Sequence, residues 1–132
     1  MTRQPRITHS EVEVPAAAET LLGNGIRLYT LASEDFEVLR ISFVFRAGSA
    51  VQRTPFSASA TANLLAEGSP EMTAAEIAER LDYYGSWYDV NIDRDYAYIN
   101  FATLSKFFDR TLAVAEEILL RPVFPEEELR TY

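Results

Sequence analysis

The sequence has no cysteine and a single histidine, His9, among its 132 residues. The absence of cysteine excludes disulfide bonds, thiol catalysis and thiolate metal sites. A single histidine excludes any site that needs two imidazoles from this chain. Glycine and proline are scarce, with 5 and 6 residues, while 48% of the residues are hydrophobic. This composition is typical of a folded globular domain and not of a disordered or fibrous chain.

Positive charge is also in short supply, because 12 lysines and arginines face 20 acidic residues and leave a net charge of -8. Such a surface repels phosphate groups, so we expect neither nucleic acid nor an anionic membrane as a partner. No hydrophobic run approaches the roughly 20 residues of a membrane-spanning helix. The start of the chain lacks the apolar stretch of a secretory signal. Together these features predict a cytoplasmic protein.

The length predicts one domain. Residues 1–11 are polar and unpatterned, so we expect a flexible N-terminal arm, followed by a single domain over residues 12–132. A helix that opens at Pro125 is cut off at Tyr132 after about two turns, too few to bury an apolar face. We therefore expect the domain to be incomplete at its C-terminus and the chain to be the beginning of a longer protein.

Strands are predicted from turn residues and from alternating hydrophobicity. Asn24-Gly25 lies between two apolar segments and predicts a hairpin, because both residues tolerate positive φ. The segment Val38–Phe45 alternates, with Ile41, Phe43 and Phe45 on one face. Trp87–Ile92 and Tyr96–Leu104 are interpreted as two further strands.

Helices are predicted over 58–66 from its alanines and from Thr73 to Gly85 from a capping box of Thr73 and Glu76. A third helix is expected after a cap at Ser105, and a fourth after Pro125. The third would bury a stripe of Phe108, Leu112, Ala115 and Leu119. The resulting order is β-β-β-α-α-β-β-α-α. It predicts an α+β fold, a largely antiparallel sheet with helices packed on one face.

Four stretches of sequence, in this order, resemble the N-terminal domain of the pitrilysin/insulinase family of zinc peptidases (peptidase family M16), which includes the mitochondrial processing peptidase subunits. The resemblance covers residues 20–132. The stretches are LGNGIRLYTL (Leu22–Leu31), ISFVFRAGSA (Ile41–Ala50), EGSPEMTAAEIAERLDYYGS (Glu67–Ser86) and a long segment that ends in RPVFPEEEL (Asp93–Leu129).

Active members of that family have H-x-x-E-H on the first helix, in which two histidines bind zinc and the glutamate activates water. Counting back from Gly68 places Ser59, Ala62 and Asn63 at those positions, so the motif is degenerate. The family's third ligand, a glutamate, would fall beyond Tyr132. The resemblance therefore implies no catalytic residue, no metal ligand and no cofactor in this chain, although zinc is expected in active members.

Family members bind peptides by adding them to an exposed sheet edge. The resemblance assigns that edge to the strand at Trp87, Tyr88, Asp89, Val90 and Asn91. Backbone pairing needs no particular side chain, so this edge would still accept a peptide. Asp89 is also compatible with the opposite role, because a charge on an edge strand discourages strand addition.

These features imply a non-catalytic subunit or fragment that has a structural and peptide-binding role beside an active zinc metallopeptidase subunit of the same family. The acidic surface favours basic peptides. One alternative is a fragment of a zinc metalloendopeptidase whose active site lies outside this chain, and another is an interaction module without a peptidase partner. No activity is expected of the chain alone. The apolar surface that an incomplete domain exposes predicts self-association as a homodimer.

Overall fold

The computed structural model describes residues 15–33 and 36–131. Strands and helices follow one another in the order predicted from the sequence, and the α+β class is confirmed. The elements are β1 (Ala18–Leu21), β2 (Arg27–Thr30), β3 (Val38–Phe45), α1 (Ser57–Asn63), α2 (Ala74–Tyr83), β4 (Trp87–Ile92), β5 (Ala97–Leu104), a 3₁₀ turn η1 (Ser105–Phe107), α3 (Phe108–Leu120) and α4 (Glu126–Thr131). The chain divides into two compact units at residues 35 and 36. The predicted arm at 1–11 lies outside the described residues.

The first unit contains the hairpin of β1 and β2, paired antiparallel. Its turn is one residue longer than the Asn-Gly pair alone would make it. The Gly25 N–H donates to the Leu22 carbonyl at 2.9 Å, and the Ile26 N–H donates to Oδ1 of Asn24 at 3.1 Å. Among the residues of this turn, only Gly25 has a positive φ, at 84°. This is a three-residue loop in which glycine occupies the left-handed position.

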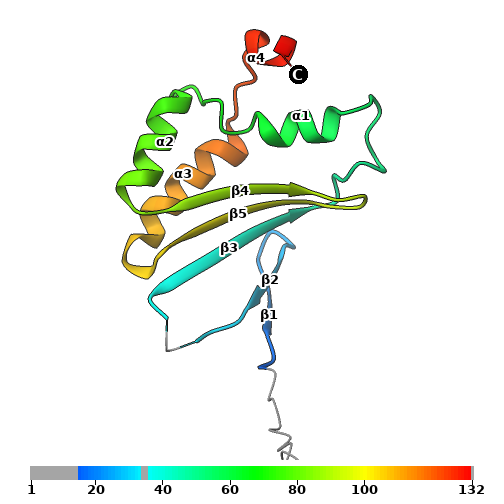
Figure 1. Cartoon of the computed structure of the whole chain (residues 1–132). Helices are drawn as coiled ribbons and strands as arrows, with labels where there is room; N and C mark the ends of the chain where they lie inside the picture. Colours follow the sequence, from blue (N-terminus) through cyan, green and yellow to red (C-terminus); the bar gives the residue numbers. More distant parts are fainter. Residues whose placement is uncertain (1–14, 34–35, 132) are drawn as a thin grey trace, which may run out of the picture. The chain divides into compact units, whose positions relative to one another are not determined.

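The second unit is built on a three-stranded antiparallel sheet in the order β3-β5-β4 (Figure 1). Its central strand β5 pairs with β3 from Val38 opposite Leu104 to Phe45 opposite Ala97, without a break. Helices α1, α2 and α3 lie on one face of this sheet (Figure 1). The two edges of the sheet therefore belong to strands that are far apart in sequence.

The loop after β3 packs closely on the turn between β4 and β5, and this contact explains the glycine in the segment RAGSA. The Gly48 N–H donates to the Asp95 carbonyl at 3.2 Å, and the Ala50 N–H donates to the Arg94 carbonyl at 2.8 Å. A Cβ atom at Gly48 would lie 2.5 Å from backbone atoms of Arg94 and Asp95. Only glycine fits at this position.

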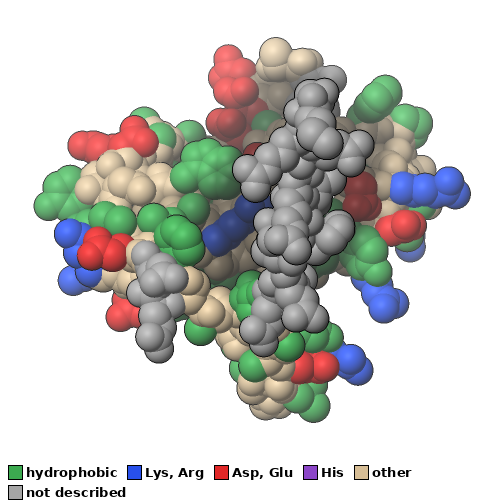
Figure 2. All heavy atoms as spheres, turned by 60° about the horizontal axis from the view of Figure 1, so that its bottom comes forward, with side chains coloured by type: hydrophobic (Ala, Val, Ile, Leu, Met, Phe, Trp, Pro, Cys, Tyr) green, Lys and Arg blue, Asp and Glu red, His purple; other side chains and the backbone are tan. Residues whose placement is uncertain are grey.

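The core of the second unit lies between the sheet and the helices. Its largest fully buried side chains are Phe101 of β5, Ile77 of α2, and Thr111 and Ile118 of α3. The T-shaped pair of Phe43 and Phe101 extends the core toward β3, with ring centroids 6.2 Å apart. Outside the core, large hydrophobic side chains reach the surface in several places, as the face in Figure 2 shows.

The structure corrects the predicted buried stripe of α3. The helix buries Thr111, Val114, Ala115 and Ile118, whereas Leu112 is 36% exposed. The reason is a polar contact: the Thr111 hydroxyl donates to Oγ1 of Thr103 at 3.0 Å and lies 2.7 Å from Oγ of Ser86. These partners satisfy a buried hydroxyl, so the helix can direct a threonine into the core.

Two helix ends also differ from the prediction. Ser105 does not cap α3, because its hydroxyl donates to the carbonyl of Glu37 at 2.9 Å. Helix α1 ends at Asn63 and not at residue 66. The chain leaves the helix there and buries Leu64 and Leu65, which are 5% and 9% exposed.

Candidate functional site

Helix α1 contains the three positions that the resemblance assigns to the zinc motif. Ser59 is half-buried, and its hydroxyl donates to the Phe56 carbonyl at 2.9 Å. Ala62 is buried at 4% exposure, and Asn63 is exposed. These positions share one helical face, because they are spaced i, i+3 and i+4. The Asn63 amide, the Ala62 methyl group and the Ser59 hydroxyl, which already donates a hydrogen bond, form a weak ligand set for a divalent transition metal.

The residue before α1 has an unusual backbone. Phe56 has a φ of 65°, in the left-handed region, and it is the only described residue other than glycine with a positive φ. Its ring is 73% exposed. A phenylalanine in this region is strained, and such strain is common at functional sites.

Strand β4 is an edge of the sheet and lies next to α1. It pairs with β5 from Trp87 opposite Ala102 to Ile92 opposite Ala97. No described residue pairs with its other side. Helix α1 packs against both β4 and β5. The structure thus places the positions that the resemblance assigns to the zinc motif close to the predicted peptide-binding strand.

The side chains of β4 alternate between the two faces of the sheet. Tyr88 and Val90 pack against the core, where the Tyr88 ring lies 5.2 Å from that of Phe101. Trp87 is 51% exposed, Asp89 is half-buried and Asn91 is exposed. The edge strand β4 therefore carries Tyr88 and Val90 on its core-facing side and mainly polar side chains on the opposite face.

A polar row of Asp89, Asn100 and Ser42 crosses all three strands of the sheet. The amide Nδ2 of Asn100 donates to Oδ2 of Asp89 at 3.2 Å, and the Ser42 hydroxyl donates to Oδ1 of Asn100 at 2.7 Å. Asn100 is 4% exposed. The hydrogen bond holds the Asp89 carboxylate along the sheet surface, beside the edge strand.

Tyr88 has a different environment. Its hydroxyl is buried and lacks a hydrogen-bond partner within the described structure. Burial raises the pKa of Tyr88 to about 12, and the negative charge of Asp89 acts in the same direction. The group is therefore a neutral phenol at physiological pH.

A cavity of about 610 Å³ borders α1 on the helix-covered side of the sheet. Its lining includes Ala62 and Leu65, Phe45 of β3 and Ile99 of β5, but no residue of β4. It is therefore separate from the free edge of β4.

The sequence prediction did not include Asn100 or the buried hydroxyl of Tyr88. A signal for the first is present, because Asn100 is the one amide in the apolar strand segment AYINFATL. No local signal identifies the second, since its lack of a partner depends on residues distant in sequence. His9 lies outside the described residues. Within those residues, no group of three or more histidine, cysteine or acidic side chains could hold a metal ion.

The second unit is a layer of helices on one face of an antiparallel sheet, and its edge strand β4, next to α1, has no strand partner on its outer side among residues 15–33 and 36–131. Neither a family model nor a curated protein matches the chain. Among solved structures, the chain is similar to a peptidase M16 inactive domain from Pseudomonas fluorescens, with a TM-score of 0.81 and 21% identity over 87% of this chain. It is also similar to a protease from Helicobacter pylori, with a TM-score of 0.77 and 18% identity over 89% of this chain.

These similarities show an M16-like fold. The chain spans 29% of the length of each of the two solved chains. In the described part of the chain, no helix has the length and apolar character needed to cross a membrane.

Proposed function

We propose that this chain is a non-catalytic, peptide-binding part of an M16-like peptidase assembly. The observation that supports the proposal most is the unpaired outer edge of β4, which lies next to α1. Helix α1 has Ser59, Ala62 and Asn63 at the positions that correspond to the zinc motif. An extended peptide would pair with the backbone of Trp87–Asn91 as an additional strand. The chain would hold the peptide and leave its cleavage to another part of the assembly.

The charge of the chain favours basic peptides. The net charge is -8, and the Asp89 carboxylate lies beside the binding edge. Because Asn100 holds this carboxylate on one face of the sheet, the backbone N–H and C=O groups of the edge stay open to a peptide. A basic peptide would be attracted as it approaches, and the attraction would weaken with added salt.

Catalysis in this proposal comes from a partner. An active M16 subunit with an intact H-x-x-E-H motif would supply zinc and the general base. This chain would close the opposite side of the peptide site. The M16 inactive domain among the similar structures is consistent with a non-catalytic role.

A second candidate is a fragment of a zinc metalloendopeptidase whose active site lies outside this chain. It is supported by the similar structure described as a protease, of which the chain spans 29%. In that case the peptide-binding edge would serve an active site in the same longer polypeptide. Zinc content separates this candidate from the first only when it is measured on the longer protein.

The experiment that tests peptide binding uses Trp87, the only tryptophan in the chain, which lies on the proposed binding strand and is 51% exposed. Titration with a basic peptide of about ten residues should give a saturable change in tryptophan fluorescence. An acidic peptide of equal length and hydrophobicity should bind several-fold more weakly. Single N-methylations along the basic peptide should weaken binding at alternate positions only, because alternate N–H groups face the edge.

Matched variants test whether the Asp89 carboxylate is responsible for the preference for basic peptides. Asp89→Asn should reduce the preference for the basic peptide a few-fold, while Glu116→Gln, an exposed position on α3, should leave it unchanged. No saturable signal with either peptide would overturn the proposal. Binding that is indifferent to N-methylation at every position would rule out strand addition. Binding without any association with an active M16 subunit would support an interaction module instead.

A further inference from the structure

The helix-free face of strand β4 presents an aromatic ring and a carboxylate side by side. Tyr88 and Val90 pack against the core, so Trp87 and Asp89, which alternate with them, lie together on the opposite face. Residues two apart in a strand are separated by about 7 Å along its axis. A group placed between these two side chains can therefore contact both of them.

The Asp89 carboxylate is held in position but is not neutralised. Its Oδ2 atom accepts a hydrogen bond from Nδ2 of Asn100 at 3.2 Å, and a carboxylate can accept further hydrogen bonds. None of the three ion pairs among residues 15–33 and 36–131 includes Asp89. The charge of this carboxylate is therefore available to a ligand.

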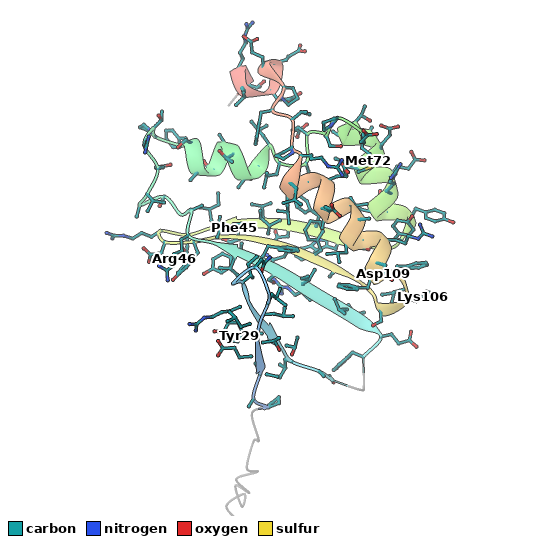
Figure 3. The ribbon with its side chains drawn as sticks, turned by 180° about the vertical axis from the view of Figure 1, so that it is seen from behind. Tyr29, Phe45, Arg46, Met72, Lys106 and Asp109 are labelled. Atoms are coloured by element: carbon teal, nitrogen blue, oxygen red, sulfur yellow. The ribbon has the colours of Figure 1, made fainter. Side chains whose placement is uncertain are left out.

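Arginine and lysine side chains around the sheet do not pair with Asp89 in the described structure. Asp89 lies opposite Asn100 in the middle of β5, whereas Arg46 and Lys106 lie at opposite ends of the sheet (Figure 3). Arg40 shares the face of Asp89 but belongs to β3, two strand spacings or about 10 Å from β4. A cation that pairs with this carboxylate would therefore come from a bound molecule.

The indole of Trp87 is also open to a cation. It lies opposite the small side chain of Ala102 and is 51% exposed. Among the described residues, the cation–π contact is between Lys106 and Phe107, and no cation lies over the indole. Arginine suits both neighbours, because its guanidinium stacks on aromatic faces and forms paired hydrogen bonds with carboxylates.

A peptide strand added to β4 would direct its side chains to the two faces in alternation. Directly opposed residues of neighbouring strands lie on the same face of a sheet. Peptide residues opposite Trp87 and Asp89 would share their face, whereas those opposite Tyr88 and Val90 would lie on the apolar side. An arginine reaches the first pair only from alternate positions, and a shift by one residue would bring its charge to the apolar side, which is unfavourable.

We propose that Trp87 and Asp89 form a subsite for one arginine side chain of a peptide that is bound along β4. This inference rests on the proposed peptide binding at β4 and adds a specificity to it. The preferred peptide is extended and has an arginine between two apolar residues. Asn100 is a positioning residue in this subsite, because its amide holds the Asp89 carboxylate on the helix-free face.

Binding of labelled peptides, measured by fluorescence anisotropy, tests the subsite without using Trp87 as the reporter. The test peptide has nine residues, alternates serine and valine, and has arginine in place of the central serine. Replacing this arginine by citrulline, its uncharged isostere, should weaken binding about ten-fold. Exchanging the arginine with a neighbouring valine, at unchanged composition, should weaken binding by a similar factor.

Matched variants assign the effect to the two side chains. Trp87→Leu and Asp89→Asn should each reduce the preference for arginine over citrulline to less than about three-fold. Tyr83→Leu on α2, where the side chain is 80% exposed, should leave the preference unchanged. Each of the three variants should bind the citrulline peptide as the unmodified chain does, because backbone pairing needs neither side chain.

The outcomes separate this subsite from the peptide binding on which it rests. Equal affinity for the arginine and citrulline peptides would overturn the subsite and leave peptide binding at β4 intact. Failure to bind either peptide would overturn both. A preference for arginine that survives Trp87→Leu, or that survives the exchange with valine, would overturn the assignment to these two residues. The peptide substitutions are measured on the unmodified chain, so they decide the proposal even if a variant does not fold.

Discussion

At the scale of single residues, Tyr88 contributes less to stability than its burial suggests. Its ring packs on Phe101, but its hydroxyl is buried without a partner in the described structure. A buried polar group that lacks a hydrogen bond is destabilising by about 1–3 kcal/mol. The ring therefore stabilises the core while its oxygen opposes that gain.

We predict that Tyr88→Phe leaves stability at neutral pH unchanged or raises it, because it removes the unpaired hydroxyl and keeps the ring. The variant should also lose less stability in alkali. The pKa of Tyr88 is raised to about 12 in the folded chain, so between about pH 10 and 12 the unfolded chain releases this proton while the folded chain retains it. Stability therefore falls as the pH rises, and the variant lacks this contribution. Urea unfolding at about pH 8 and about pH 11 measures both effects.

The control for this prediction is Tyr83→Phe, whose side chain is 80% exposed, and it should match the unmodified chain at both values. Tyr98 acts in the same direction as Tyr88, because its hydrogen bond to Asp93 also raises its pKa. Both the parent and Tyr88→Phe contain Tyr98, so the difference between them isolates Tyr88. A variant that is destabilised at neutral pH would show that the hydroxyl has a partner in solution.

At the scale of elements, α2 begins with a reciprocal cap. The Thr73 side chain accepts a hydrogen bond from the Glu76 N–H at 3.3 Å, and Oε2 of Glu76 accepts one from the Thr73 N–H at 2.8 Å. The backbone hydrogen bond from Thr73 lowers the pKa of the Glu76 carboxyl. Folding of the helix therefore favours the charged form of the Glu76 carboxyl.

We predict that Thr73→Ala costs about 1 kcal/mol of unfolding free energy, the usual value of an N-cap side chain. A carboxyl with a lowered folded pKa stabilises the fold above its unfolded pKa, and this stabilisation disappears as the pH falls below about 4.5. Thr73→Ala keeps the backbone donor but removes the hydroxyl that donates to Oε2 of Glu76 at 2.9 Å, which also lowers this pKa, so it should lose somewhat less stability on acidification than the parent. Thermal unfolding at about pH 7 and about pH 3 measures this, with Thr61→Ala inside α1 as the control. An equal acid sensitivity of Thr73→Ala and the parent would contradict the cap.

The elements also show which parts of this fold can be predicted from the sequence. The bounds of β3 and β4 agree with the prediction, because strict alternation identifies a strand with one buried face. Helix α2 was predicted from its cap, which is a local signal. The buried face of α3 was predicted only in part. Ala115 is buried as predicted, but Leu112 is exposed and Thr111 is buried, because the buried face depends on hydroxyl partners at Ser86 and Thr103 in other elements.

The candidate site was predictable to a similar extent. The strand at Trp87–Asn91 and the positions on α1 were assigned through the family resemblance, and their proximity to each other is visible only in the structure. The hydrogen bond between Asn100 and Asp89 joins two strands, so it depends on a pairing register that no local pattern specifies. The roles of Ser59, Ala62 and Asn63 stay a prediction.

At the scale of the whole molecule, the zinc content of this chain tests the assignment of the zinc-motif positions to Ser59, Ala62 and Asn63. Serine and asparagine are poor zinc ligands compared with histidine, cysteine and carboxylates. We predict that the purified chain binds much less than one zinc per chain and shows no chelator-sensitive peptidase activity. Elemental analysis after dialysis against zinc measures the first, with an active zinc peptidase as the positive control. One tightly bound zinc per chain would show that the alignment of the motif positions is wrong.

The row of Ser42, Asn100 and Asp89 also has a consequence for how the sheet assembles. A slip of β5 by one residue would exchange its two faces. The amide of Asn100 would then enter the apolar layer under the helices, and Phe101 would leave the core for the polar face that holds Ser42 and Asp89. Misaligned pairings are thus penalised twice, through an unsatisfied amide and a ring lost from the core. The polar row of Ser42, Asn100 and Asp89 therefore favours the native strand register over registers that are shifted by one residue.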